Sequence, residues 1–316
     1  MLSNDIAAAH STMRIVTLGL PLAALLLVHD KHNVVLAGLR SGLTLGQRRL
    51  RSMIGIDRVV TDPHKDWSHF RKRMEALQPD LLVSWFFTRR IPMDVVQTCP
   101  LQGIGIHPSM LPRHRGPDPY FAAIDAGDTV TGVTVHRLEE DYDTGDILAQ
   151  QTLPIHPRWN AWQLARALDR PSLELLRKTV ARIAARESIH ALPQDASVAT
   201  YAHAPTIDDR ILRWNRRAAD IVRRILALAP NPGALAWFAQ STLVVHDACV
   251  RDSLPCLEPG EAAIIDGVAV VRASDRGVAL LRGEIDGALV GPEDIAQQIG
   301  SGADDSRSCT LRSGDD

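Results

Sequence analysis

Two short stretches of the sequence combine residue types that can move protons. His107 ends the apolar run LQGIGIH, and Pro108 follows it at once. Because proline fixes its own backbone φ, the chain after the histidine is stiff enough to hold one imidazole still. Asp143 lies in the acidic loop EEDYDTG, which follows a second apolar run, VTGVTVHRL. A carboxylate that orients an imidazole makes a pair suited to general acid–base catalysis near neutral pH.

Each stretch also has a plainer interpretation. His107 alone fits a rigid loop with an incidental histidine, and the acidic stretch alone fits a solvated turn. The elements that carry the two stretches must therefore decide whether they form one site.

The pattern from Met13 onward predicts an α/β domain with a mostly parallel sheet. Apolar runs such as MRIVTLGL, NVVLAGLR, DLLVSWF and LQGIGIH alternate with helix-like stretches, which is typical of a sheet covered by helices. The runs VTGVTVHRL and DILAQQTLPI then resemble paired strands around a loop, and a helix is expected from about residue 159 or 160 to 185. Because the carboxyl ends of neighbouring parallel strands meet in one crevice, we expect His107 and Asp143 to share a pocket.

Bulk properties narrow the class of protein. The chain has 316 residues, 45% of them hydrophobic, and a formal net charge of −2, which argues against a general nucleic-acid coat. The four cysteines form no CxxC pair, so we expect free thiols, no metal site and a cytoplasmic protein. The most apolar run, residues 18–28, is too short for a membrane span. Neither GxGxxG nor GxxxxGK[ST] occurs, so no phosphate-binding loop is encoded.

The pattern changes after about residue 187. A helix is expected over residues 211–229, followed by several short β-like runs with glycine turns, which suggest a small barrel. The expected organisation is a disordered extension at 1–12, an α/β domain at 13–187, a linker at 188–205, a barrel domain at 206–300 and a disordered tail at 301–316.

Long stretches of the chain resemble one family. HPSMLPRHRG, followed by PDPYFAAIDAGDTVTGVTVHRLEEDYDTGDIL, resembles the signature of the folate-dependent formyltransferases, which include methionyl-tRNA formyltransferase and the glycinamide ribonucleotide and sugar-amine formyltransferases. The stretch from residue 199 to 234 is similar to the start of the C-terminal domain of methionyl-tRNA formyltransferase. The resemblance, which covers about residues 13–295, implies a Rossmann-like formyltransferase domain and an OB-like C-terminal domain.

The resemblance implies transfer of a formyl group from 10-formyltetrahydrofolate to a primary amine. The family uses an Asn-x-His pair and an aspartate, and His107 and Asp143 match the last two, whereas Gly105 stands in place of the asparagine. The missing carboxamide would polarise the formyl oxygen, and Ser109 or a backbone N–H is a candidate substitute. A slower transferase that is assisted by water and a non-catalytic folate-binding or ligand-binding relative are the alternatives. If Gly105 only leaves a hole, Gly105→Asn should raise turnover.

The resemblance also implies a folate site and an amine acceptor. The family's main chain binds the pterin ring at the place of residues 84–92, so the expected binding residues are Trp85, Phe86, Arg89, Arg90 and Ile91, together with Asp141. The two aromatic residues equally suit the core, and the arginines equally suit the surface. Pro119, Thr131 and Gly145 match positions that shape the cleft.

The acceptor stays open between a small-molecule amine, such as an amino sugar or a metabolite, and a charged tRNA. An arginine stripe in and before the expected helix of the second domain could hold tRNA phosphates or form a solvated face: Arg210, Arg213, Arg216, Arg217, Arg223 and Arg224. The segment from Arg40 to Arg58 is a second basic candidate. The departure at Gly105 favours the small amine slightly, and the oligomeric state is unknown.

Overall fold

The structure is a computed structural model that describes residues 12–42, 44–238, 241–252, 256–301 and 309–312. The contacts between residues divide the chain into two units that alternate along the sequence. The first comprises Met1–Pro117, Val130–Pro154 and Ala167–Tyr201, and the second comprises Asp118–Thr129, Ile155–Arg166 and Ala202–Asp316. The sequence pattern alone suggests a single break near residue 187. None of the helices in the described part of the chain is long and apolar enough to cross a membrane.

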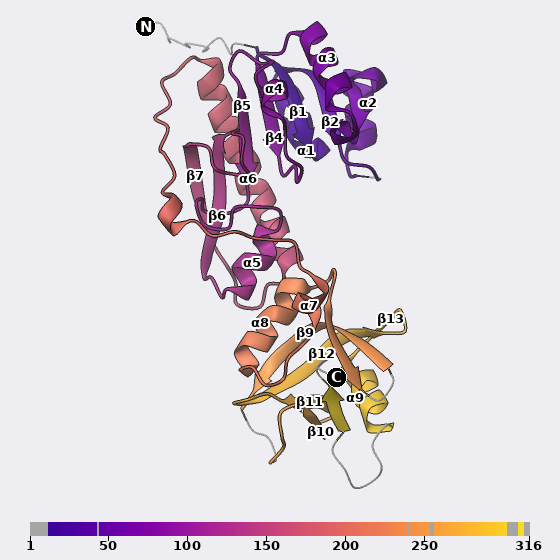
Figure 1. The fold of residues 1–316 in the computed structure, drawn as a ribbon. Helices are drawn as coiled ribbons and strands as arrows, with labels where there is room; N and C mark the ends of the chain where they lie inside the picture. Colours follow the sequence, from indigo (N-terminus) through magenta and orange to yellow (C-terminus); the bar gives the residue numbers. More distant parts are fainter. Residues whose placement is uncertain (1–11, 43, 239–240, 253–255, 302–308, 313–316) are drawn as a thin grey trace, which may run out of the picture. The chain divides into compact units, whose positions relative to one another are not determined.

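The first unit is built on a seven-stranded sheet in the order β3-β2-β1-β4-β5-β6-β7 (Figure 1). Its first five strands are mutually parallel. The strand bounds are β1 Arg14–Gly19, β2 Asn33–Leu39, β3 Val59–Thr61, β4 Leu81–Trp85, β5 Gly103–His107, β6 Val130–Arg137 and β7 Ile147–Pro154. Every residue of β4 and of β5 is buried, as expected for parallel strands covered on both faces.

Helices connect the parallel strands and supply most of the remaining core. These connecting helices are α1 Pro21–His29, α2 Gln47–Ile54, α3 Trp67–Leu77 and α4 Met93–Val96. α5 Pro119–Asp125 belongs to the second unit, and α6 Ala161–Ala184 begins in the second unit and continues in the first. On α3, Phe70 and Met74 are fully buried four residues apart, so one face of the helix packs against the sheet. The predicted α/β fold with a mostly parallel sheet is confirmed.

The last two strands of this sheet run against the others. β6 pairs antiparallel with β5, from Ile104 opposite Arg137 to His107 opposite Thr134, and β7 pairs antiparallel with β6. The carboxyl end of β6 therefore lies beside the amino end of β5. The prediction that His107 and Asp143 both follow parallel strands is therefore wrong, because β6 runs antiparallel to β5.

The second unit contains a closed antiparallel sheet. The strand order is β11-β10-β14-β8-β9-β12-β13, and a further pairing of β11 with β12 closes the ring. The strand bounds are β8 Ala234–Phe238, β9 Ser241–Arg251, β10 Glu261–Ile265, β11 Val268–Arg272, β12 Gly277–Ile285, β13 Ala288–Val290 and β14 Cys309–Arg312. The expected small barrel is confirmed, and the helices of this part are α7 Ile207–Arg210, α8 Ala218–Leu228 and α9 Pro292–Ser301.

The expected disordered tail is wrong for residues 309–312. They form β14, which lies between β10 and β8 and is needed to complete the ring. Polar composition concealed this strand, because a short strand in a barrel is fixed by pairing with its neighbours rather than by its own apolar pattern. The other parts of the expected tail, 302–308 and 313–316, and the expected extension up to residue 11 lie outside the described residues.

The helix expected over residues 211–229 is shorter in the structure. α8 begins at Ala218, and Ile211 instead forms a bridge with Leu235 of β8. Arg213, Arg216 and Arg217 therefore precede the helix, so the arginines do not form a stripe on one helical face.

Several of these arginines contact groups of their own unit. Arg224 makes a bidentate ion pair with Asp125, with Nε–Oδ1 and Nη2–Oδ2 distances of 2.6 and 2.8 Å, and its guanidinium lies 5.5 Å from the ring centre of Phe121. Arg223 contacts Asp220, and Arg210 donates to the carbonyls of Gly233 and Pro232. These side chains stabilise the second unit, which leaves fewer charges for a polyanion.

Replacement of Arg224 tests this structural role. We expect Arg224→Ala to lower the free energy of unfolding by about 1–3 kcal/mol, because a bidentate charged hydrogen bond and an aromatic contact are lost together. Arg217→Ala is the matched control, since that side chain is 70% exposed and its nitrogen is 3.8 Å from Asp275, and it should change stability by less than about 0.5 kcal/mol. Urea denaturation measures both, and equal stabilities of the two variants would contradict the assignment.

Candidate active site

The His107 side chain is held at both ring nitrogens. It ends β5 and is 6% exposed. Its Nε2–H donates to the carbonyl of His114 at 2.7 Å, which leaves Nδ1 to face Oδ2 of Asp143 at 3.4 Å. Burial lowers the pKa of the His107 imidazole below its ordinary value, and the charge of Asp143 opposes this effect only in part. A largely neutral imidazole beside a fixed carboxylate can accept a proton at Nδ1.

Asp143 is the centre of this arrangement. Its backbone has a positive φ of 56°, and its Oδ2 accepts a hydrogen bond of 2.8 Å from the backbone N–H of Gly116. Burial alone would raise the pKa of the carboxyl, but His107, His136 and the Gly116 N–H together hold that pKa below its usual range. Asp143 is therefore an ionised carboxylate at neutral pH.

A second histidine, His136 on β6, approaches the same carboxylate. Its Nε2 is 3.4 Å from Oδ1 of Asp143, while its Nδ1–H donates to the carbonyl of Arg137 at 2.8 Å. The ring is 3% exposed, and its residue is the register partner of Gly105 on β5. Sequence reasoning missed His136. The available signal was its place in VTGVTVHRL, three residues before the acidic loop.

The loop between β6 and β7 brings Asp143 to the two histidines by folding back. It leaves β6 near the amino end of β5, where the Leu138 N–H donates to the carbonyl of Gly103 at 2.9 Å. Gly145 permits the return, because a Cβ at this position would lie 2.1 Å from the carbonyl oxygen of Arg137. Asp143 thus reaches His107 across the face of two antiparallel strands.

The side-chain amide of Gln194 clamps this loop. Its Nε2 donates to the carbonyls of Asp143 and Gly145 at 2.8 and 2.7 Å, and its Oε1 accepts two hydrogen bonds from Arg115 at 3.0 and 2.8 Å. Gln194 lies in the segment that the sequence suggests is a linker. That segment carries no periodic pattern, so its contact with the loop had no signal in the sequence.

Ser109 is engaged within the loop that follows β5. The residue is fully buried, and its hydroxyl donates to the carbonyl of Arg113 at 2.6 Å. Thr134 of β6 donates to the carbonyl of Ser109 at 2.7 Å, which fixes the same turn. Ser109 would have to give up its bond to Arg113 to act as the substitute donor.

The segment after β4 reaches the loop of Asp143 through one arginine. Arg90 donates from Nε to the carbonyl of Glu140 at 2.9 Å and forms an ion pair with the Glu140 carboxylate at 3.3 Å. The side chains of Arg89 and Asp141 are exposed. Arg90 therefore brings the segment after β4 into contact with the loop that contains Asp143.

The aromatic residues of this segment have different environments. Trp85 is 1% exposed, and its indole N–H donates to the hydroxyl of Ser172 at 3.0 Å, so its side chain belongs to the core. Phe86 stacks on Trp85 with ring centres 4.5 Å apart, has a φ of 54° and is only half-buried. Ile91 is also buried, in the cluster beneath α3 and α4. Any contact of Trp85 and Ile91 with a ligand would come from their main chain.

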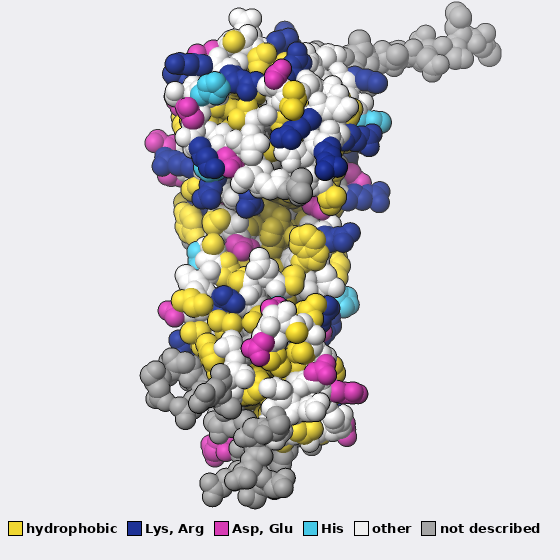
Figure 2. All heavy atoms as spheres, turned by 90° about the vertical axis from the view of Figure 1, so that its right-hand side faces the viewer, with side chains coloured by type: hydrophobic (Ala, Val, Ile, Leu, Met, Phe, Trp, Pro, Cys, Tyr) yellow, Lys and Arg dark blue, Asp and Glu magenta, His cyan; other side chains and the backbone are white. Residues whose placement is uncertain are grey.

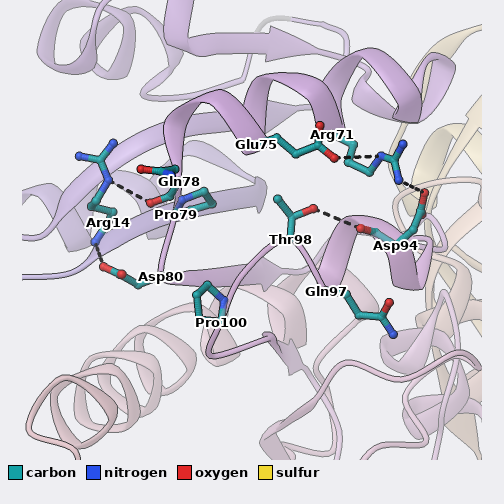
Figure 3. A pocket seen from close by; sticks show the side chains of 10 residues that line it. All are labelled: Arg14, Arg71, Glu75, Gln78, Pro79, Asp80, Asp94, Gln97, Thr98 and Pro100. Atoms are coloured by element: carbon teal, nitrogen blue, oxygen red, sulfur yellow. Dashed lines mark hydrogen bonds and ion pairs between the residues drawn. The ribbon is translucent and has the colours of Figure 1, made fainter.

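A surface hollow lies at the amino ends of the parallel strands and contains none of the predicted site residues. It is lined by residues around the amino ends of the strands, including Arg14, Asp80 and Pro100 (Figure 3). Its charges pair with one another, since Arg71 lies 3.2 Å from Asp94 and the Arg14 N–H donates to Asp80. The chemistry of the site is at the opposite ends of the parallel strands.

Comparison with known proteins assigns the family. The family model "Formyl transferase" matches residues 60–180, and "Formyl transferase, C-terminal domain" matches residues 206–298. A methionyl-tRNA formyltransferase of Clavibacter sepedonicus is 31% identical over 285 residues, which cover 85% of this chain and 92% of the relative. The chain belongs to the formyltransferase family. The relative from Syntrophus aciditrophicus, also a methionyl-tRNA formyltransferase, is 34% identical over 214 residues and covers 67% of this chain and 68% of its own length.

Solved structures of formyltransferases and related proteins share the fold. HypX from Aquifex aeolicus, in complex with tetrahydrofolic acid, superposes with a TM-score of 0.64 at 20% identity. The match covers 96% of this chain and 51% of HypX, so the chain spans about half of that larger protein. An N-formyltransferase from Helicobacter canadensis, with folinic acid and dTDP-3-aminofucose, gives a TM-score of 0.64 at 12% identity over 85% of this chain and 99% of its own. The formyltransferase is thus a two-part enzyme with the expected α/β and barrel domains.

Titration of His107 tests the electrostatics of the site. The ¹³C NMR signal of the His107 ring should titrate below pH 6.5, because burial disfavours the charged ring. In Asp143→Asn the midpoint should fall further, since the carboxylate that favours the charged ring is gone. The signal is assigned with a His107→Asn variant, in which it should be absent. A midpoint above 6.5 for the wild-type protein would contradict the arrangement.

Proposed function

We propose that this formyltransferase moves the formyl group of 10-formyltetrahydrofolate to a primary amine. The observation that carries the proposal is the 3.4 Å approach of His107 Nδ1 to Asp143 Oδ2, at the two positions where the family signature has its histidine and aspartate. The site contains an ionised carboxylate and an imidazole that burial keeps largely neutral, which is the state required to take a proton from an attacking amine.

The reaction needs one proton transfer in each direction. The amine nitrogen attacks the formyl carbon, the π electrons of the C=O bond move onto the oxygen, and the proton that the nitrogen loses passes to Nδ1 of His107. Asp143 then stabilises the imidazolium. The oxygen electrons re-form the C=O bond as the bond from the formyl carbon to N10 breaks, and N10 takes that electron pair and the proton. The products are the N-formyl amine and tetrahydrofolate.

Three observations support a folate donor. HypX was solved with tetrahydrofolic acid and the Helicobacter canadensis enzyme with folinic acid. In this chain, residues 86–92 lie between β4 and α4 outside any helix or strand, so they can present main-chain groups to a flat heterocycle. Arg90 links this segment to the loop of Asp143, which supports a pterin site close to the proposed base.

The acceptor is a primary amine, and we favour a small molecule over a charged tRNA. Three of the six arginines that could have held tRNA in the second unit, Arg210, Arg223 and Arg224, contact backbone carbonyls, Asp220 and Asp125 instead. The first unit keeps a basic surface, since Arg40, Arg48, Arg49 and Arg58 are exposed. Figure 2 shows Lys and Arg side chains gathered over the upper part of the face, which the first unit forms. This surface suits an amine that carries phosphate.

Turnover with a panel of acceptors tests the proposal. The purified protein is incubated with 10-formyltetrahydrofolate and either amino sugars, sugar nucleotides with a free amine, amino acids or methionyl-tRNA, and release of tetrahydrofolate is followed. Formylation of a small amine at a rate well above that of methionyl-tRNA is expected. Preference for methionyl-tRNA would refute the small-acceptor proposal. Tight folate binding without turnover on any amine would favour the non-catalytic alternative.

Asp143→Asn separates charge from shape at the site. We expect kcat to fall by at least about 10³-fold while folate affinity changes little, because the amide keeps the volume but cannot stabilise the imidazolium. Glu139→Gln in the same loop is the matched control, since its exposed carboxylate faces solvent, and it should keep near-normal turnover. Near-normal turnover of Asp143→Asn would show that His107 does not work with Asp143.

A further inference from the structure

The place that an asparagine side chain would need at position 105 is already filled. A Cβ built on Gly105 would lie 2.6 Å from Nε2 and 2.8 Å from Cε1 of His136, which is closer than real Cβ atoms come to such neighbours. The next contact, Leu138 Cδ2 at 3.0 Å, belongs to a flexible side chain that can move. The hypothesis that Gly105 only leaves a hole is therefore wrong, because an imidazole from the neighbouring strand covers it.

The register of the two strands explains this exchange. Gly105 and His107 lie two residues apart on β5 and so face the same side of the sheet, and their register partners on β6 are His136 and Thr134. Directly opposite residues in an antiparallel pair have side chains about 5 Å apart. A bare glycine on one strand thus gives the partner's ring room to lie over its backbone.

We infer that His136 supplies the donor that the family takes from the asparagine, so that its Nε2–H polarises the formyl oxygen in place of the missing carboxamide. The inference rests on the proposed function and names one more catalytic residue for it. Nε2 of His136 lies 2.6 Å from the position that the Cβ of a side chain at residue 105 would occupy.

The hydrogen bonds of the ring fix which nitrogen does this. Nδ1–H is occupied by the carbonyl of Arg137 at 2.8 Å, so Nε2 is the nitrogen left to face the site. Nε2 itself faces Oδ1 of Asp143 at 3.4 Å, an acceptor that matches an N–H at this nitrogen. The single carboxylate thus serves both rings, with Oδ2 toward the base His107 and Oδ1 toward the donor His136.

The donor must act on charge that exists chiefly in the transition state. As the amine attacks, the formyl oxygen gains negative charge, and an N–H aimed at it lowers the barrier more than it strengthens binding of the ground state. Loss of this donor should therefore appear in kcat and leave the affinity for the folate donor almost unchanged.

Five variants separate a donor from a packing residue. His136→Phe keeps a ring of similar size without the N–H, and we expect kcat to fall by about 10²–10³-fold. His136→Gln, whose amide can donate, should retain more activity than His136→Phe. Gly105→Asn alone should lose activity, because its Cβ collides with the ring. The kcat of the double variant Gly105→Asn/His136→Ala should exceed that of His136→Ala at least about tenfold, because the asparagine then has space for its side chain and can donate its amide N–H to the formyl oxygen.

A spectroscopic readout keeps the test independent of turnover. The C=O stretch of 10-formyltetrahydrofolate, labelled with ¹³C in the formyl group, is measured by difference infrared spectroscopy on the full-length protein in the absence of any amine. A donor at Nε2 should shift the stretch of the bound formyl group to lower frequency in the wild type than in His136→Phe, with partial return of the shift in the double variant.

The outcomes distinguish the two proposals. If the wild type binds the labelled donor but the stretch is the same in His136→Phe, or if His136→Phe keeps wild-type kcat, His136 is a packing residue and this inference fails while formyl transfer stands. If the wild type neither binds the donor nor formylates any amine, the proposed function fails, and the inference about His136 fails as well because it rests on that function. Melting temperatures of all five variants identify any loss that comes from unfolding.

Discussion

A carboxylate taken largely out of water must be given other partners, and the site is organised around that requirement. The side chain of Asp143 is only 17% exposed, and isolated burial of such a charge is costly. The N–H of Gly116 and the rings of two histidines replace the lost hydration. These partners come from β5, from β6 and from the loop after β5, so the site exists only when the sheet edge and both loops are in place.

Hydrogen bonds to the main chain also orient both histidine rings. One nitrogen of each ring hydrogen-bonds a backbone carbonyl, that of His114 for His107 and that of Arg137 for His136. The other nitrogen of each ring faces Asp143. The orientation of each ring is therefore set by a main-chain carbonyl, which substitutions do not easily change. Because the two histidine rings share the carboxylate of Asp143, the contributions of the three residues are coupled, and the effects of single replacements will not add.

The sequence predicted a large part of this and missed the rest for identifiable reasons. The buried strands around His107 and the hairpin that carries Asp143 had clear periodicity, and the long signature led to the right family. The expected meeting of His107 and Asp143 was correct in its outcome but rested on a parallel arrangement, whereas β6 is antiparallel and its loop folds back. His136 and Gln194 were missed because strand register and the contacts of an aperiodic segment are set by tertiary structure. The arginine stripe was wrong because helical spacing was extended seven residues beyond the start of α8 at Ala218.

The clamp made by Gln194 changes how the catalytic part of this enzyme can be isolated. A fragment that ends at residue 187 would retain every side chain assigned to proton transfer and to the formyl oxygen. It would lack the one amide that bonds the carbonyls on either side of Thr144, and with it the link to Arg115. The segment that follows α6 therefore helps to hold the loop of Asp143, although it lies outside the part of the chain that carries the candidate site residues. Dissection of the enzyme into domains should therefore cut after Tyr201, where the first unit ends.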